Sequence, residues 1–129
     1  MDRESKKMSV NLSMPVLVVD DYPFMAMIVI TLLKQIGFEH IEGAEDGNVA
    51  LQKLARKKYG LVISDDTMDL ISGNELLQKM RANPDMSKTP FLMLTAPTAN
   101  QAEVANAVTI AKPFNARTLQ TKIEALLAA

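Results

Sequence analysis

Acidic side chains directly follow two apolar stretches of this sequence, a pattern that suits metal or phosphate chemistry. Asp20 and Asp21 come after residues 15–19, and Asp65 closes a second run that begins at Leu61. Uninterrupted apolar runs of this length predict strands that are buried on both faces. Ligands of an open parallel sheet bind beyond the carboxyl ends of its strands, so carboxylates there are well placed for chemistry. Taken alone, each acidic group could also simply open a turn, as Asp often does.

A hydroxyl and an amine stand at the ends of two later apolar runs. Thr95 follows residues 90–94, and Lys112 follows residues 107–111. Separately, Thr95 could merely end a strand and Lys112 could be an ordinary surface lysine. Parallel strands place all of their carboxyl ends at one edge of the sheet, where these two groups would join the carboxylates. The agreement of four strand ends therefore predicts one shared site.

The chemistry of such a site follows from its charges. Carboxylates gathered in apolar surroundings repel one another, and a bound cation relieves that repulsion. Oxygen ligands without Cys or clustered His favour Mg²⁺, Ca²⁺ or Mn²⁺, and we expect Mg²⁺ because it combines a few carboxylates with water and phosphate oxygens. A carboxylate can also attack phosphorus to give an aspartyl phosphate, for which the central Asp65 is the candidate. Lys112 and Thr95 would then stabilise the transferring phosphoryl group.

Length and composition limit the other possibilities. The 129 residues fit one domain, and 14 basic against 15 acidic residues give a net charge of −1. This balance favours neither nucleic acid nor an anionic membrane as a partner. The chain has no Cys and one His, His40, which excludes disulfides and Cys- or His-rich metal sites. We expect a cytoplasmic protein without a signal peptide or membrane span, with a disordered N-terminal tail over 1–13 and one folded domain over 14–129.

Strand and helix signals alternate along the folded part of the chain. Strands are predicted over residues 15–19, 39–43, 61–65, 90–94 and 107–111. Helices are predicted from Pro23 to Gly37, from Gly47 to Lys58, from Ser72 to Asn83 and from Asn115 to Leu127. Strands alternating with helices at this length specify an α/β fold, a doubly wound domain with a five-stranded parallel sheet.

Four motifs in this order resemble the receiver domains of two-component response regulators. They are residues 18–21, 62–65, 94–96 and 112–114, reading VVDD, VISD, LTA and KPF. The resemblance covers residues 15–127 and is greatest to single-domain, CheY-like chemotaxis regulators. It implies the flavodoxin-like, CheY-like strand arrangement, with a fourth helix that is shortened here.

The resemblance also implies roles for individual residues. Asp65 would accept a phosphoryl group from a histidine kinase or phosphotransfer protein. Mg²⁺ would be bound by Asp20, Asp21, Asp65 and the backbone carbonyl of Thr67. Thr95 and Lys112 would contact the phosphoryl group, and the Lys112–Pro113 peptide bond would be cis. The protein would be a regulatory phosphoacceptor rather than an enzyme, with self-phosphorylation from small donors, autodephosphorylation and altered binding of an output protein. We expect a monomer or weak dimer.

The sequence departs from the family pattern at several places. Thr109 stands where the family usually has an aromatic residue that follows the movement of Thr95. Thr95 and Lys112 are closer in sequence than usual, which shortens the fourth helix by about a turn or more. Asp69 occupies a position that is commonly Pro, and Asp66 adds a carboxylate beside the acceptor. Residues 97–106 contain poor helix formers, and we predict that they form a segment that orders differently on phosphorylation or partner binding.

Three alternatives belong to other functional classes. A receiver-like protein-interaction module that works without phosphorylation is the main one. A phosphatase of the haloacid dehalogenase kind would need a second Asp two residues after Asp65, where this chain has Thr67. A flavodoxin-type FMN binder would need a phosphate-binding loop after the first strand, where Asp20 and Asp21 would repel a phosphate.

Overall fold

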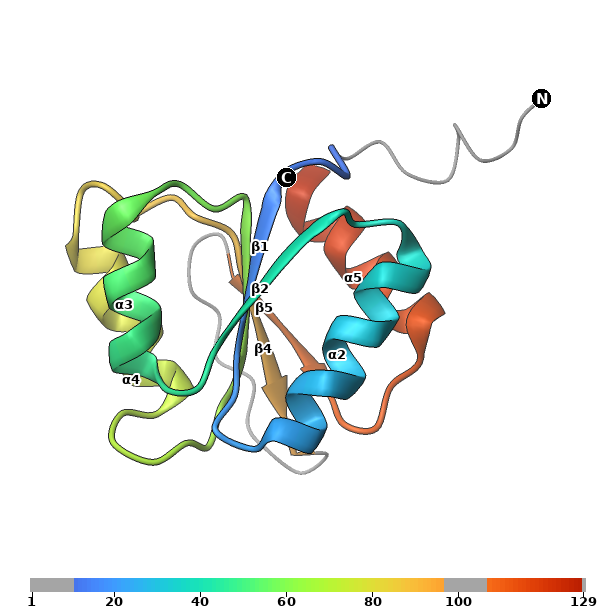
Figure 1. The fold of residues 1–129 in the computed structure, drawn as a ribbon, viewed down its shortest axis with the longest axis horizontal. Coiled ribbons are helices and arrows are strands. Elements are labelled where there is room, and N and C mark those ends of the chain that lie inside the picture. The colour runs from blue at the N-terminus through green and yellow to red at the C-terminus, as the bar shows by residue number, and fades with distance from the viewer. Residues whose placement is uncertain (1–10, 97–106, 129) are drawn as a thin grey trace.

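A five-stranded parallel sheet forms the centre of the protein, with helices on both of its faces (Figure 1). The computed structural model describes residues 11–96 and 107–128. Its strand order is β2-β1-β3-β4-β5. The strands are β1 (Pro15–Val19), β2 (His40–Ala44), β3 (Leu61–Asp65), β4 (Phe91–Thr95) and β5 (Ala107–Ala111). The helices among the described residues are α2 (Pro23–Ile36), α3 (Gly47–Arg56), α4 (Gly73–Ala82) and α5 (Ala116–Ala128). The predicted α/β class and doubly wound parallel sheet are confirmed.

Alternate residues of the central strands supply two separate cores. In β1, Val16 and Val18 face the layer of α2 and α5, whereas Leu17 and Val19 face the layer of α3 and α4. The same alternation continues in β3, where Ile63 belongs to the first core and Val62 to the second. Both faces of these strands are therefore covered, which explains why β1 and the first three residues of β3 are apolar without interruption.

Local sequence signals define the ends of the helices. Pro23 lies in the first turn of α2, and Gly37 ends that helix with a φ of 123°, a value that favours glycine. Ser72 and Glu75 form the predicted capping box of α4, each accepting a hydrogen bond from the other's backbone amide. The Asn115 side chain accepts a hydrogen bond from the Thr118 amide at the start of α5.

Some expectations fall on parts of the chain outside the described residues. β4 ends at Thr95 and β5 begins at Ala107, so the shortened fourth helix that the resemblance implies and the predicted switching segment over 97–106 lie outside the described residues. The predicted disordered tail over 1–13 lies outside them up to residue 10; beyond it, the Leu12 carbonyl accepts a hydrogen bond from the Glu39 amide at 3.1 Å. None of the described helices has the length and apolar character needed to cross a membrane.

Candidate functional site

The strand order brings the predicted site residues to one edge of the sheet. β1 pairs with β2 on one side and β3 on the other, so the chain changes direction across the sheet at the boundary between β1 and β3. Val19 is in register with Ser64, which places the next residues, Asp20 and Asp65, at adjacent strand ends. This boundary is the position at which doubly wound sheets bind their ligands.

Three carboxylates meet at this boundary. Ligand oxygens of Asp20, Asp21 and Asp65 all lie within 4.8 Å of one another. Asp20 and Asp65 are 3 % and 7 % exposed, whereas Asp21 is partly open to solvent. Burial raises the pKa of Asp20 to about 6, and the neighbouring charges of Asp65 and Asp21 add to this rise, although a hydrogen bond from the Tyr22 amide opposes it.

The cluster suits a hard divalent cation. The Tyr22 amide donates to Asp20 Oδ1 at 2.9 Å, but Asp20 Oδ2 is buried and has no hydrogen-bond partner among the described residues. A buried carboxylate oxygen without a donor costs free energy, which a bound cation would recover. All three carboxylates offer oxygen ligands, which Mg²⁺ prefers.

The basic side chain of Lys112 lies next to Asp65, the candidate phosphoacceptor. Lys112 Nζ is 3.0 Å from Asp65 Oδ1, and the Asp66 amide donates to the same oxygen at 2.9 Å. Lys112 follows β5, so this contact joins two strand ends that are 47 residues apart in sequence. The Lys112–Pro113 peptide bond is cis, as the resemblance implies. No described residue donates a hydrogen bond to Asp65 Oδ2, which leaves that oxygen available to react with phosphorus or bind a metal ion.

Thr95 and Lys112 are held together by the sheet. The Lys112 amide donates to the Thr95 carbonyl at 2.8 Å, and Thr95 is in register with Ala111. The Thr95 hydroxyl donates to the Ile110 carbonyl at 3.4 Å and is almost fully buried. Thr95 therefore stands at the correct edge of the sheet, with its hydroxyl directed to β5 in this state.

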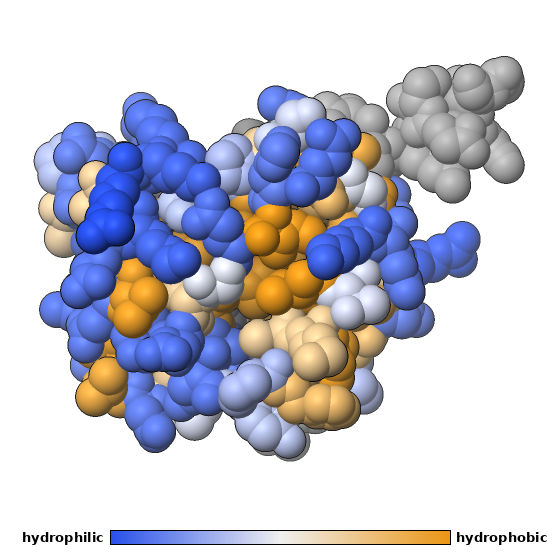
Figure 2. Space-filling model, viewed as in Figure 1, coloured by the Kyte–Doolittle hydropathy of each residue, from blue (hydrophilic) through white to orange (hydrophobic). Residues whose placement is uncertain are grey.

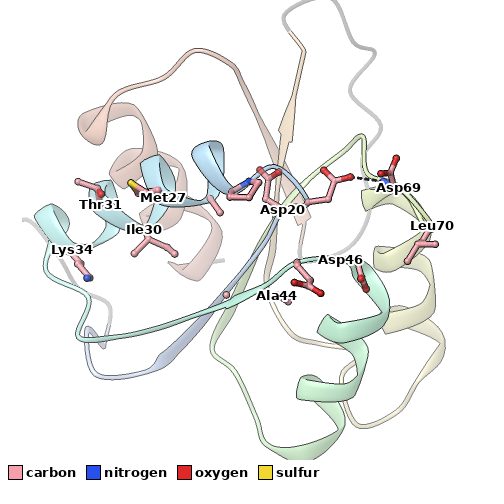
Figure 3. Close-up of a pocket in the computed structure, with 14 residues that line it drawn as sticks. Asp20, Met27, Ile30, Thr31, Lys34, Ala44, Asp46, Asp69 and Leu70 are labelled. Atoms are coloured by element: carbon pink, nitrogen blue, oxygen red, sulfur yellow. Dashed lines mark hydrogen bonds between the residues drawn. The ribbon is translucent and has the colours of Figure 1, made fainter.

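The loop that follows β3 holds a contact that the sequence did not indicate. The backbone amide of Asp69 donates a hydrogen bond to Asp21 Oδ2 at 2.8 Å (Figure 3). The next residue, Leu70, has a φ of 70° and is 72 % exposed. Because the family commonly has Pro at this position, Asp69 in the sequence signals a backbone N–H here, but residue types could not show that Asp21 is its acceptor. Thr67 lies in the same loop with its hydroxyl bonded to Asp66 Oδ1 at 3.1 Å, and the role of its carbonyl stays a prediction.

A groove of about 880 Å³ adjoins the acidic cluster (Figure 3). Its apolar wall comes from α2, and carboxylates from three loops surround its rim. The lining residues include Asp20, Asp46, Asp69, Met27, Ile30 and Leu70. Large apolar side chains are also exposed along the first turns of α2, where Figure 2 shows apolar colours at the surface.

Comparisons with known proteins agree with this arrangement. The family model described as the response regulator receiver domain matches residues 16–124. The chain is 36 % identical to the chemotaxis protein CheY-3 of Vibrio cholerae, over 88 % of this chain and 92 % of that protein. It is 34 % identical to the chemotaxis protein CheY of Pseudomonas aeruginosa, over 86 % of this chain and 94 % of that one. Among solved structures, the response regulator TrrA of Thermotoga maritima, in complex with Mg²⁺–BeF, is 31 % identical with a TM-score of 0.77 and covers 88 % of this chain and 99 % of its own.

The match to the family model spans all four strand ends that build the acidic edge, from Asp20 to Lys112. The relatives are matched over nearly their whole length, and the sheet order and acidic cluster are those that the resemblance implied. The chain therefore belongs to the response regulator receiver family, as a CheY-like member.

Proposed function

We propose that the protein is a response regulator that accepts a phosphoryl group on Asp65 from a histidine kinase or phosphotransfer protein and signals by altered binding of an output protein. The observation that carries this proposal is the position of Asp65 between two unlike groups. Asp20 and Asp21 lie on one side, and the ammonium of Lys112 lies 3.0 Å away on the other. A nucleophilic carboxylate beside a metal-binding pair and a fixed cation suits phosphoryl transfer.

The transfer step follows from the positions of these groups. A carboxylate oxygen of Asp65 attacks phosphorus in line with the leaving group, so that an O–P bond forms as the donor's P–N bond breaks. The electron pair of that bond goes to the leaving imidazole nitrogen. Lys112 stabilises negative charge on the phosphoryl oxygens, and the Thr95 hydroxyl donates to another once it turns from Ile110. When bound by Asp20, Asp21, Asp65 and the Thr67 carbonyl, Mg²⁺ would neutralise charge on these ligands and on the phosphoryl oxygens.

The same groups account for reversal of the signal. An acyl phosphate is open to attack by water, which releases inorganic phosphate and regenerates the Asp65 carboxylate. Phosphorylation from small donors such as acetyl phosphate needs no further residues from this chain. The protein is thus a regulatory phosphoacceptor whose own site limits the lifetime of the signal.

The signalling step uses the contact between Thr95 and β5. Movement of the Thr95 hydroxyl toward a phosphoryl group would break its 3.4 Å hydrogen bond to the Ile110 carbonyl and favour a second state of this edge. The nearby Thr109, in register with Met93, is only half-buried and has no aromatic ring to follow this movement. We propose a cytoplasmic protein, a monomer or weak dimer, whose output partner is another protein rather than nucleic acid or membrane.

A direct experiment tests the phosphorylation. The protein is incubated with acetyl phosphate and Mg²⁺, and its intact mass is measured. We expect one phosphoryl adduct in the wild type and in the matched control Asp66→Asn, and none in Asp65→Asn or in the presence of EDTA. An adduct that persists in Asp65→Asn would contradict the proposal.

A second candidate is a receiver-like interaction module that works without phosphorylation. The exposed apolar side chains of α2, among them Phe24, Met27 and Ile28, favour it, because such a surface suits a protein partner in either state. No adduct from acetyl phosphate or from cognate kinases would favour this module.

A further inference from the structure

The carboxylate of Asp21 accepts a hydrogen bond from the loop that follows β3. Asp21 follows β1, whereas the amide that donates to its Oδ2 belongs to Asp69, 48 residues further along the chain. Figure 3 shows this contact at the acidic end of the groove. One oxygen of Asp21 is thereby occupied, and the carboxylate group still contributes an oxygen to the cluster with Asp20 and Asp65.

The fold fixes the position of the Asp69 amide. At the far end of its loop the Gly73 amide donates to the Asp66 carbonyl at 3.0 Å, and a Cβ on Gly73 would collide with the Asp65 carbonyl oxygen. Met68 and Ile71, on either side of the loop's tip, pack against the core between the sheet and α3 and α4. The left-handed conformation of Leu70 is maintained by these surroundings, because an isolated leucine disfavours it.

A fixed donor beside a ligand carboxylate affects how well that carboxylate binds a metal. Asp21 is the most exposed of the three acidic groups, so without a partner its side chain would rotate among several positions. Hydrogen bonds that orient metal-ligating side chains typically change metal affinity by about 10- to 100-fold. The Asp69 amide is the group that the structure places in this role for Asp21.

We propose that the backbone N–H of Asp69 is a positioning group for Mg²⁺ binding: its hydrogen bond fixes the Asp21 carboxylate in the cluster with Asp20 and Asp65. This inference rests on the proposed Mg²⁺ site, which the buried and unpartnered Asp20 Oδ2 supports independently. It assigns the effect to the amide and not to the exposed side chain of Asp69.

Two substitutions separate the amide from the side chain. Asp69→Ala removes the carboxylate and keeps the N–H, whereas Asp69→Pro removes both. The difference between these two variants therefore reports on the N–H together with the restraint that the proline ring puts on the loop backbone. Mg²⁺ binding to the full chain is measured by isothermal titration calorimetry, and thermal unfolding in EDTA shows whether each variant is folded.

We expect Asp69→Pro to bind Mg²⁺ at least tenfold more weakly than Asp69→Ala. Equal affinities of the two folded variants would overturn the inference while leaving the metal site intact. Absence of Mg²⁺ binding in the wild type would overturn the metal site, and this inference with it.

A second measurement does not depend on how proline affects the loop. Hydrogen exchange of the Asp69 amide is followed by nuclear magnetic resonance in the wild type and in Asp21→Ala. The inference requires that loss of the Asp21 acceptor speeds exchange at this amide at least tenfold, with the Gly73 amide of the same loop as an internal control. Unchanged exchange at Asp69 would refute the contact itself.

Discussion

The two sides of the acidic edge differ in how their charges are compensated. On the β5 side, Asp65 Oδ1 accepts from both Lys112 and the Asp66 amide. On the β1 side, Asp20 Oδ2 is buried without a partner among the described residues, and burial raises the pKa of this group to about 6. The protein thus supplies a cation, Lys112, on the β5 side, whereas on the β1 side a cation would have to come from solution. On the proposed function, this difference would put the phosphoryl group toward Lys112 and the metal ion toward Asp20 and Asp21.

Loss of the Lys112 side chain should have the largest effect on the difference between the two sides, seen in the rate of phosphorylation. Lys112→Ala takes away the cation on the β5 side, and we expect phosphorylation by acetyl phosphate to slow by on the order of 10²-fold, as for loss of one donor to a developing anion. The rate is measured from the adduct in intact-mass time courses at saturating Mg²⁺. The exposed Lys88 serves as a control, because Lys88→Ala should leave the rate unchanged. Equal rates in both variants would mean that the β5 side does not stabilise the transfer.

The pH dependence of stability tests the raised pKa of Asp20 on the β1 side. Between about pH 4 and pH 6 the folded protein holds a proton on Asp20 that the unfolded chain has released. Its free energy of unfolding without metal should therefore fall as the pH rises through this window, by about 2 to 3 kcal/mol from this group. Urea unfolding in EDTA, compared between the wild type and Asp20→Asn at each pH, isolates this contribution. A difference between the two proteins that stays constant from pH 4 to pH 7 would contradict the raised pKa.

The smallest expected effect is the change in stability from Asp20→Asn at neutral pH. The substitution removes a buried charge beside Asp21 and Asp65 but still buries a polar amide, so we expect a net gain of about 1 kcal/mol in EDTA. The variant should also lose the stabilisation that Mg²⁺ gives the wild type. Thermal unfolding with and without Mg²⁺ checks both points, with the exposed Asp85→Asn as the matched control. If Mg²⁺ stabilised Asp20→Asn as much as the wild type, the metal would have to bind elsewhere.

Most of the fold could be predicted because local signals and burial agree along the chain. The apolar runs of β1, β3 and β4 are buried on both faces, and the caps at Ser72 and Asn115 start their helices where the pattern indicated. Parallel strands then determine which residues share an edge. The cluster of Asp20, Asp21 and Asp65 was predictable for this reason, even though the residues are far apart in sequence.

The details that could not be predicted depend on the backbone and on burial of single atoms. The Asp69 amide reaches Asp21 because Gly73, Met68 and Ile71 fix the path of the loop, and residue types alone do not define that path. Residue types likewise do not distinguish the surroundings of Asp20 from those of Asp21. Only the packing around Asp20 shows that one of its oxygens is buried without a donor.

The central claim is that Asp65 becomes an acyl phosphate, and locating the modified residue tests it most directly. The protein is phosphorylated with acetyl phosphate and Mg²⁺, reduced with borohydride, digested and sequenced by tandem mass spectrometry. Reduction converts a phosphorylated aspartate to homoserine, so the account predicts homoserine at position 65 alone. Homoserine at position 66, 20 or 21 instead, with Asp65 unchanged, would contradict it.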